Sequence, residues 1–236
     1  MIRIFVPSYG RAGLASTMRI LPSAQIVVPL SQLGDYDRFY PGRVVPIPDE
    51  SDGHIARKRN AILDLLDEDE ACFMVDDDLL SVDKIKHGKL SDVEQTMEVF
   101  SNLAEDAQAY FGGFSNYNDP GKMAEYAPLS FTKPSYGCVY IRNDSNIRYD
   151  ESLGRHEDVD VYLQYMLEHR FVLRDNRYYF KFECNKDVSK KAQPGGIEGG
   201  ELEHYSALIA LRNKWGDLIK IKDGNMNGVH QPIKGT

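Results

Sequence analysis

The sequence predicts an α/β fold: a mostly parallel central sheet with helices on both faces, in a single domain over residues 1–236. Segments with strand character alternate with segments of helical periodicity from the N-terminus, which is typical of a parallel sheet. The strand segments are rich in apolar and β-branched residues and end at proline or glycine. A chain of 236 residues is also long enough to bury a substantial core.

The first part of the chain predicts four strands and one helix. Apolar runs that end at proline indicate the first three strands, IRIFVPS (2–8), QIVVPL (25–30) and RVVPIP (43–48). The segment 54–66 is helical, because Ile55, Ile62 and Leu66 recur at helical spacing. The short apolar run ACFMV (71–75) is then a buried strand.

The remainder of the chain continues the alternation. A long helix is predicted over 91–111, with Ser91 as its N-cap and Glu94 completing a capping box. Later apolar runs predict further elements: strands near 137–142, 171–175 and 177–183, and a helix over 157–170 between the first two of these strands. Trp215 lies on an amphipathic segment and is predicted to be a core residue.

Composition and charge exclude several classes of protein. No window approaches a membrane span, and the three cysteines fit neither a disulfide framework nor a CxxC metal site. We therefore expect a cytoplasmic protein with no membrane partner and no obligate protein partner. The net charge of −8 argues against broad adhesion to nucleic acid and leaves room only for a local basic patch.

Three consecutive aspartates, Asp76, Asp77 and Asp78, directly follow the predicted strand 71–75. Ligands of open α/β sheets gather beyond the carboxyl ends of the strands, where the loop PSYGRAG (7–13) after the first strand would also lie. Adjacent carboxylates repel, and a hard divalent cation such as Mg²⁺ or Mn²⁺ would turn the repulsion into attraction while also binding a diphosphate. The alternative is a solvated, aspartate-rich turn.

Five motifs in this order resemble glycosyltransferases of the GT-A fold over roughly the first 175 residues. They are IFVPSYGRAG, GHIARKRNAIL with its G-x-x-x-R-x-x-N spacing, FMVDDDL as a DxD element, PSYGCVYIRND, and the acidic element in GRHEDVDVYLQYMLEHRF. More narrowly, DDDL and HEDVD are similar to phage glycosyltransferases that are encoded beside thymine- or cytosine-oxidising enzymes and modify hydroxymethylated DNA bases. The resemblance implies a GT-A fold, a UDP-sugar donor and a host cytoplasmic location.

The resemblance also implies a division of the chain and a set of donor contacts. Residues 1–80 would bind the nucleotide, 81–180 would face the acceptor, and 181–236 would form a flexible loop and a C-terminal helix and tail. The nucleotide-binding residues would be Pro7, Ser8, Tyr9, Arg11, Arg57, Asn60, Asp76 and Asp77, and the metal ligands Asp76, Asp78 and His204. His230 is an alternative to His204, and each would otherwise be a surface histidine. Lys190 with Lys191 would close over the diphosphate, or would be a solvated pair in a loop. An ordinary turn at Tyr9–Arg11 and a solvated helix face at Arg57 and Asn60 remain open.

Asp158 is predicted to be the general base, with Glu157 as the second candidate. An ionised carboxylate ordered at a helix start can accept the proton of an acceptor hydroxyl as it attacks the anomeric carbon. A single base implies inversion, whereas two carboxylates would also allow a double displacement. Asp158 would alternatively serve only as an N-cap.

Other functions also fit parts of the pattern. A sugar nucleotidyltransferase shares the acidic metal site, but PSYGRAG has few glycines for gripping phosphate. His156 and Asp158 with a later histidine imitate an iron site, although that chemistry usually occurs on all-β barrels. A non-catalytic nucleotide-sugar-binding module would not need both acidic motifs. A saccharide or protein acceptor is the alternative to hydroxymethylated DNA.

Overall fold

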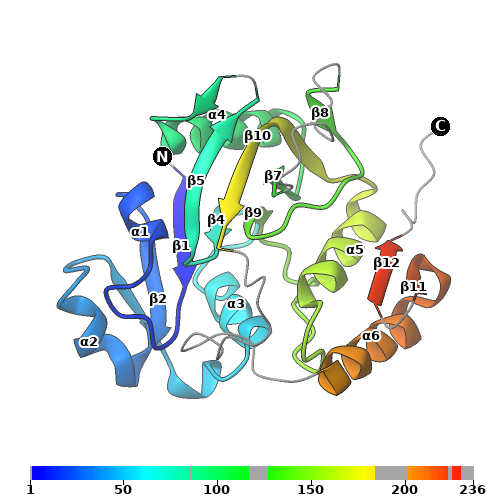
Figure 1. Cartoon of the computed structure of the whole chain (residues 1–236), viewed down its shortest axis with the longest axis horizontal. Coiled ribbons are helices and arrows are strands. Elements are labelled where there is room, and N and C mark those ends of the chain that lie inside the picture. The colour runs from blue at the N-terminus through cyan, green and yellow to red at the C-terminus, as the bar shows by residue number, and fades with distance from the viewer. Residues whose placement is uncertain (1, 86, 117–126, 184–200, 223–224, 230–236) are drawn as a thin grey trace.

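The computed structural model describes residues 2–85, 87–116, 127–183, 201–222 and 225–229. A 10-stranded sheet forms the centre of the molecule, in the order β3-β2-β1-β4-β9-β7-β10-β5-β6, with β8 paired to β10 (Figure 1). Helices lie on both sides of this sheet, so the predicted architecture is confirmed.

The N-terminal half of the sheet is parallel and matches the expected strands. β1 (Arg3–Pro7) pairs with both β2 (Gln25–Pro29) and β4 (Ala71–Val75), and β2 pairs with β3 (Val44–Ile47). β1, β2 and β4 are buried at every residue but the first, as expected for strands covered on both faces. Their carboxyl ends therefore meet at one edge of the sheet.

The second half of the sheet is mixed. β9 (Cys138–Arg142) is antiparallel to β4 and to β7 (Phe111–Ser115), while β10 (Leu173–Phe182) is parallel to β7. Consequently β4, β7 and β10 point the same way, and β9 opposes them. The two strands expected over 171–175 and 177–183 are one strand, β10. The segment FGGFS forms β7, a strand that was not predicted, and its first residue, Phe111, was expected to end a helix.

Shorter elements fill the connections. α1 (Thr17–Ile20) and α2 (Leu33–Asp37) separate the first strands, and the antiparallel β5 (Leu79–Lys84) returns from the aspartates along β10. The remaining small elements are β6 (Gly88–Lys89), β8 (Leu129–Ser130) and 3-10 turns at Leu30–Gln32, Asp49–Ser51 and Gly216–Leu218.

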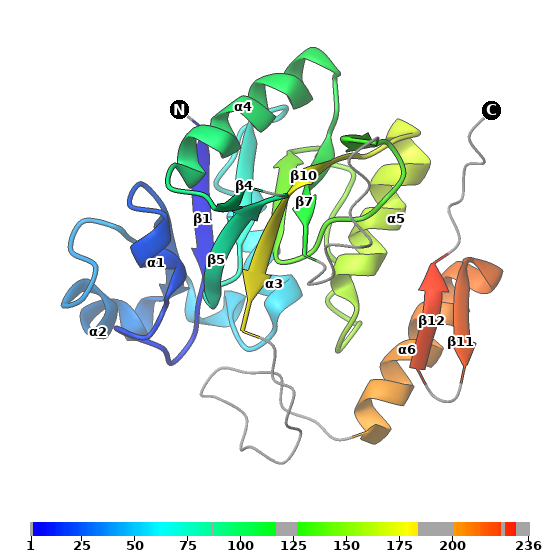
Figure 2. The same ribbon diagram turned by 45° about the horizontal axis from the view of Figure 1, so that its top comes forward.

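Two apolar clusters, one on each face of the sheet, form the core. One cluster contains Met97 and Phe100 of α4 (Val93–Asp106) together with side chains of α1 and α2. The other contains Ile62 of α3 (Ile55–Leu63) and Tyr162 of α5 (Glu157–His169). Figure 2 shows α4 on one side of the sheet and α3 and α5 on the other.

The N-cap of α4 differs from the expected one. The Asp92 side chain, rather than Ser91, accepts a hydrogen bond from the backbone N–H of Gln95 at 3.0 Å. The helix begins at Val93, one residue later than a Ser91 cap requires, and it ends at Asp106, before the predicted end at 111.

The C-terminal segment packs beside α5 (Figure 1). It consists of α6 (Glu201–Trp215) and a hairpin of β11 (Ile219–Lys222) and β12 (Asn225–Val229). Leu211 and Ile219 are buried in the apolar cluster that contains Ile62 and Tyr162. Trp215, which was expected in the core, packs against this cluster and is partly buried. No helix among the described residues has the length and apolar character needed to cross a bilayer.

Candidate functional site

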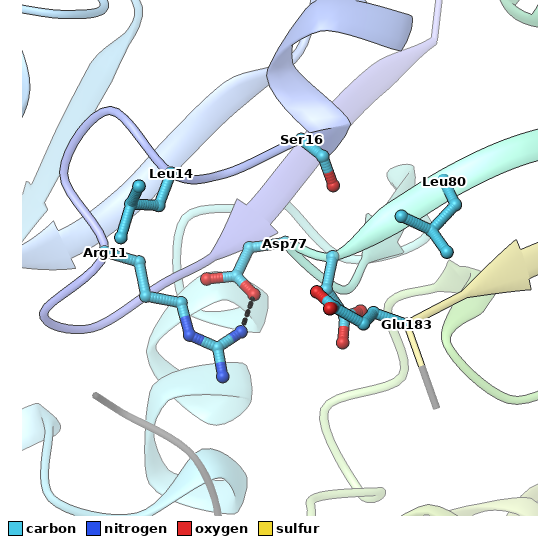
Figure 3. A pocket seen from close by; sticks show the side chains of 7 residues that line it. Arg11, Leu14, Ser16, Asp77, Leu80 and Glu183 are labelled. Atoms are coloured by element: carbon cyan, nitrogen blue, oxygen red, sulfur yellow. Dashed lines mark hydrogen bonds and ion pairs between the residues drawn. The ribbon is translucent and has the colours of Figure 1, made fainter. Parts of the chain in front are cut away.

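A pocket at the carboxyl edge of the sheet is lined by two of the residues predicted to bind the donor, Arg11 and Asp77, and by Asp78, a predicted metal ligand. The pocket has a volume of about 260 Å³ and is shown in Figure 3. Asp77 and Asp78 follow β4, and Glu183 follows β10, so strands distant in sequence deliver carboxylates to one place. The lining is completed by the β1–α1 loop and the start of β5, through Arg11, Leu14, Ser16 and Leu80.

Asp77 is anchored to the loop after β1. Its carboxylate accepts hydrogen bonds from the Ser8 hydroxyl at 2.6 Å and from Nη1 of Arg11 at 2.5 Å. The Tyr36 hydroxyl lies 2.9 Å from Oγ of Ser8 and accepts the Arg11 backbone N–H. Gly10 has a φ of +65°, the left-handed conformation that lets the loop turn there. Ser8, Arg11 and Asp77 thus form one ordered polar group.

Tyr9 projects outward from the same loop. Its side chain is 49% exposed, and Nζ of the buried Lys58 lies 5.5 Å from its ring centroid. Lys58 also donates to the Ser8 carbonyl and pairs with Asp52 at 2.8 Å. Burial lowers the pKa of Lys58, and its contact with Asp52 opposes that shift. An exposed aromatic ring supported by a fixed cation is a suitable platform for a nucleobase.

Asp76 is joined to Glu157 through a buried arginine. Nη2 of Arg59 donates to Oδ1 of Asp76 at 2.9 Å, and Nη1 donates to Oε1 of Glu157 at 2.8 Å. Burial raises the pKa of Asp76, while the Arg59 cation opposes the shift. Arg59, which lies 17 residues from Asp76 and 98 residues from Glu157 in the sequence, therefore brings together the acidic motif after β4 and the acidic motif at the start of α5.

Asp78 has a different environment from Asp77. Burial, together with the neighbouring charges of Asp76 and Asp77, raises the pKa of Asp78 to about 7. The backbone of this turn is fixed by Thr17, whose hydroxyl donates to the Asp76 carbonyl at 2.5 Å and accepts the Leu79 N–H at 3.0 Å. The turn therefore concentrates negative charge that a cation would neutralise.

Asp158 lies in the first turn of α5 and is not its N-cap. The cap position is occupied by His156, which has a left-handed backbone (φ 65°, ψ 22°) and makes no side-chain capping bond. Oδ1 of Asp158 accepts the backbone N–H of Val159 at 2.8 Å. Burial and the Glu157 charge raise the pKa of Asp158 to about 7, and Arg59 opposes the shift. A carboxyl group with this pKa is suited to proton transfer near neutral pH.

Arg57 and Asn60, which are predicted to contact the nucleotide, contact residues 149–151 within the chain. Nε of Arg57 donates to the Glu151 carboxylate at 3.1 Å, and Arg57 is 45% exposed. Asn60 donates to the Tyr149 carbonyl at 2.9 Å and accepts the Tyr149 N–H at 2.9 Å. These bonds tie α3 to the segment that precedes α5.

His204, the expected third metal ligand, lies beside His156. Their ring centroids are 5.2 Å apart, and burial lowers the pKa of His156. Within the described ranges, no three or more His, Cys, Asp or Glu side chains are arranged to hold a metal ion. His230, Lys190, Lys191 and the glycine-rich stretch 193–200 lie outside the described residues.

The aspartates nevertheless fit the chemistry of magnesium or manganese. Magnesium is usually held by one or two carboxylates, with water and substrate phosphates completing its coordination. Asp76 and Asp78 would offer two hard oxygen ligands, and burial with the neighbouring charges of Asp76 and Asp77 raises the pKa of Asp78. Neutralisation by a cation would relieve this repulsion.

Sequence reasoning did not identify Arg59 and Lys58 as members of the site. A signal was present, because Ala56, Arg59 and Ile62 recur every three residues on the buried face of α3. A charged residue on the apolar stripe of a helix requires a buried partner, which here is an aspartate or glutamate at the sheet edge. The identity of that partner depends on tertiary structure.

Comparisons with known proteins agree with this architecture. Two crystal structures are similar in fold: TarS 1-349 of S. aureus (13% identity, TM-score 0.51, covering 90% of this chain and 65% of that one) and the same protein in complex with UDP (14%, 0.50, 90% and 66%). This chain thus spans about two thirds of the TarS fragment, and no curated protein matches it. A family model for TET-associated glycosyltransferases matches residues 2–189. With most of its length matched, the chain belongs to the TET-associated glycosyltransferase family.

Proposed function

We propose that the protein transfers a sugar from a UDP-sugar, with the help of Mg²⁺ or Mn²⁺, to a hydroxyl group of an acceptor. The observation that carries this proposal is the convergence of Asp76, Asp77 and Asp78 with Glu157 and Asp158 at one sheet edge. Membership of a glycosyltransferase family and the fold shared with TarS, which is known in complex with UDP, support the same reading.

The donor nucleotide would bind over the loop that follows β1. Tyr9 offers an exposed ring for stacking, and Ser8, Arg11 and Asp77 offer hydrogen-bond donors and acceptors for the uridine. Pro7 ends β1 and fixes where this loop begins. Arg57 and Asn60 would contribute indirectly, by holding residues 149–151 in place.

Asp76 and Asp78 would hold the divalent cation, and His204, which lies beside His156, is not arranged with them as a third ligand in the described part of the chain. Held by the two aspartates, the cation would supply positive charge against that of the diphosphate leaving group. Asp76 shares one oxygen with Arg59, so its position is set before any ligand arrives. The Asp76 carboxylate is therefore pre-organised to hold a cation that binds the diphosphate.

Asp158 would act as the general base of a single displacement with inversion. The acceptor oxygen forms a bond to the anomeric carbon, the bond from that carbon to UDP breaks, and the acceptor proton moves to Asp158. Glu157 is less available for this role, because Arg59 already binds one of its oxygens at 2.8 Å. It would instead fix the start of α5.

The proposed acceptor is a hydroxymethylpyrimidine in phage DNA. The family's association with TET enzymes supports this choice, because oxidation of a methylated base creates the hydroxyl group that a transferase needs. A base in a duplex must be extruded before it can enter such a pocket, at a cost of a few kcal/mol. With a net charge of −8, the chain would bind phosphates through local contacts, for which Lys220, Arg142 and the lysines at 190, 191 and 222 are candidates.

The experiment offers labelled UDP-sugars and Mn²⁺ with four acceptors: a hydroxymethylated duplex, the matched unmodified duplex, small saccharides and peptides. We expect incorporation only into the hydroxymethylated duplex, at a rate that falls as salt is raised. Incorporation only into saccharides or peptides would contradict the DNA acceptor and leave sugar transfer intact. The absence of both transfer and donor hydrolysis with every UDP-sugar would contradict the proposed function itself.

A further inference from the structure

Arg59 contacts carboxylates that come from two different elements. Its guanidinium donates through Nη2 to Asp76, which follows β4, and through Nη1 to Glu157, the first residue of α5. The Arg59 side chain is 9% exposed and the Glu157 side chain is 11% exposed, so water competes little with the second bond. The planar, fixed spacing of the two Nη atoms therefore sets the separation of the two carboxylates.

The surroundings of Arg59 hold the guanidinium in one orientation. It projects from the buried face of α3, and its Cζ lies 5.5 Å from the ring centroid of Tyr149. Although burial alone would lower the pKa of Arg59, the nearby charges, of which Asp76 contributes most, raise it above its ordinary value. The cation therefore persists at any pH at which the protein is folded.

We propose that Arg59 is a positioning residue, which fixes the distance between the donor side of the site at Asp76 and the acceptor side at Glu157 and Asp158. The inference rests on the proposed sugar transfer and assigns a role to a residue that contacts neither of the reacting atoms. The physical basis of the proposal is that one rigid guanidinium group, from α3, binds both Asp76 and Glu157. Neither carboxylate can shift without breaking a charged hydrogen bond to Arg59.

The bridge also affects the proposed base electrostatically. The charged groups that face Asp158 are Glu157 on its own helix, Arg59 on α3, and Asp76 after β4. Arg59 is the positive member of this set and lowers the pKa of Asp158, whereas the two carboxylates raise it. Loss of the Arg59 charge would therefore leave Asp158 protonated to a higher pH, and transfer would require more alkaline conditions.

Two substitutions separate geometry from charge. Arg59→Met keeps much of the side-chain volume and removes both the charge and the bridge. Arg59→Lys keeps the charge, but its single ammonium group cannot reproduce the fork that spans two carboxylates. Arg43→Met is the matched control, because Arg43 is a partly buried arginine that binds the carbonyls of Met18, Leu21 and Ala24, outside the site.

The measurement is the pH profile of kcat and KM for transfer from a UDP-sugar. We expect kcat to fall about 100-fold at neutral pH in both Arg59 variants, with KM for the donor changed much less. The acid limb of the profile should move to higher pH in Arg59→Met and stay near its wild-type position in Arg59→Lys. Millimolar guanidinium should restore part of kcat in Arg59→Ala, which leaves room for the missing group.

Several outcomes would overturn the inference. One is an Arg59→Lys variant with wild-type kcat, and another is an Arg59→Met variant with an unmoved acid limb and a loss of kcat no larger than that of Arg43→Met. If Arg59→Met does not fold, the kcat of Arg59→Lys and the guanidinium rescue of Arg59→Ala decide the question. Failure of the proposed function is distinguishable, because the wild-type protein would then transfer no sugar at all.

Discussion

Asp78 is held by the folded chain next to two other carboxylates. Burial and the charges of Asp76 and Asp77 raise its pKa from 3.8 to about 7. A carboxyl group whose folded pKa is raised binds its proton more tightly in the folded state than in the unfolded one. Its contribution to stability is therefore fully present below about pH 4 and is lost as the pH rises through about 7. Near and above neutral pH, ionised Asp78 destabilises the protein without a cation.

We predict that Asp78→Asn makes the metal-free protein more stable at pH 8. A shift of three pKa units corresponds to about 4 kcal/mol, and because Asp78 lines an open pocket we expect about 1–2 kcal/mol after screening by water. Urea unfolding in the presence of chelator measures the gain, which should shrink as the pH is lowered toward 4. The control is Asp64→Asn, an exposed carboxylate that should change stability little. A variant less stable than wild type at pH 8 would contradict this account of Asp78.

The sequence located some site residues and missed others for a physical reason. Asp76–Asp78 were expected at the carboxyl edge of the sheet and Glu157–Asp158 at a helix start, because strand ends and helix starts are visible in local patterns. The structure brings them together through Arg59. Arg59 was missed because its importance comes from partners 17 and 98 residues away, and helical periodicity describes only one helix at a time. The nucleotide-binding and catalytic roles of these residues stay predictions.

At the scale of elements, the start of α4 offers a test of capping. The Asp92 carboxylate accepts the Gln95 N–H, one of the amide groups that has no partner within the helix. We expect Asp92→Ala to lower the free energy of unfolding by about 1 kcal/mol, and Ser91→Ala to have almost no effect. Chemical denaturation of the two variants measures the difference. If Ser91→Ala lowers the free energy of unfolding more than Asp92→Ala does, Ser91 is the N-cap of α4, as the sequence predicts.

The attachment of α6 to α5 depends on a buried carboxylate. Asp160 is fully buried, and its Oδ1 accepts a hydrogen bond from Nε1 of Trp215 at 2.7 Å and pairs with Nζ of Lys214 at 2.8 Å. Trp215→Phe replaces the indole by a smaller aromatic ring and removes the donor, so we expect a loss of about 1–3 kcal/mol. Urea unfolding tests this value. If Trp215→Phe matches wild type, the bond does not hold the C-terminal segment in place.

Two strands in the second half of the sheet could not be delimited from local pattern. β7 contains Gly112 and Gly113, which disfavour a strand by propensity. At Gly112 a Cβ atom would lie 2.2 Å from the Leu173 carbonyl oxygen, so glycine permits β10 to approach β7. The need for glycine at position 112 comes from the neighbouring strand β10, which lies about 60 residues away in the sequence. By contrast, the parallel strands β1, β2, β3 and β4 were predicted well, because their apolar runs end at clear turn signals.

At the scale of the whole molecule, ligand binding at the carboxyl edge should stabilise the entire chain. We predict that UDP raises the melting temperature by about 5–10 °C in the presence of Mn²⁺ or Mg²⁺ at ligand concentrations near 100 times Kd. With chelator the shift should be much smaller, and Asp78→Ala should abolish the metal-dependent part. Equal shifts with metal and with chelator would remove the cation from the mechanism.

In the proposed mechanism, Asp158 accepts the acceptor's proton during sugar transfer. The most direct test compares wild type with Asp158→Asn, which keeps the shape of the side chain and cannot take up a proton. At saturating UDP-sugar, with a hydroxymethylated duplex as acceptor, we predict that kcat falls about 10²- to 10⁴-fold while donor affinity is unchanged. Transfer by Asp158→Asn at close to the wild-type rate would contradict the claim.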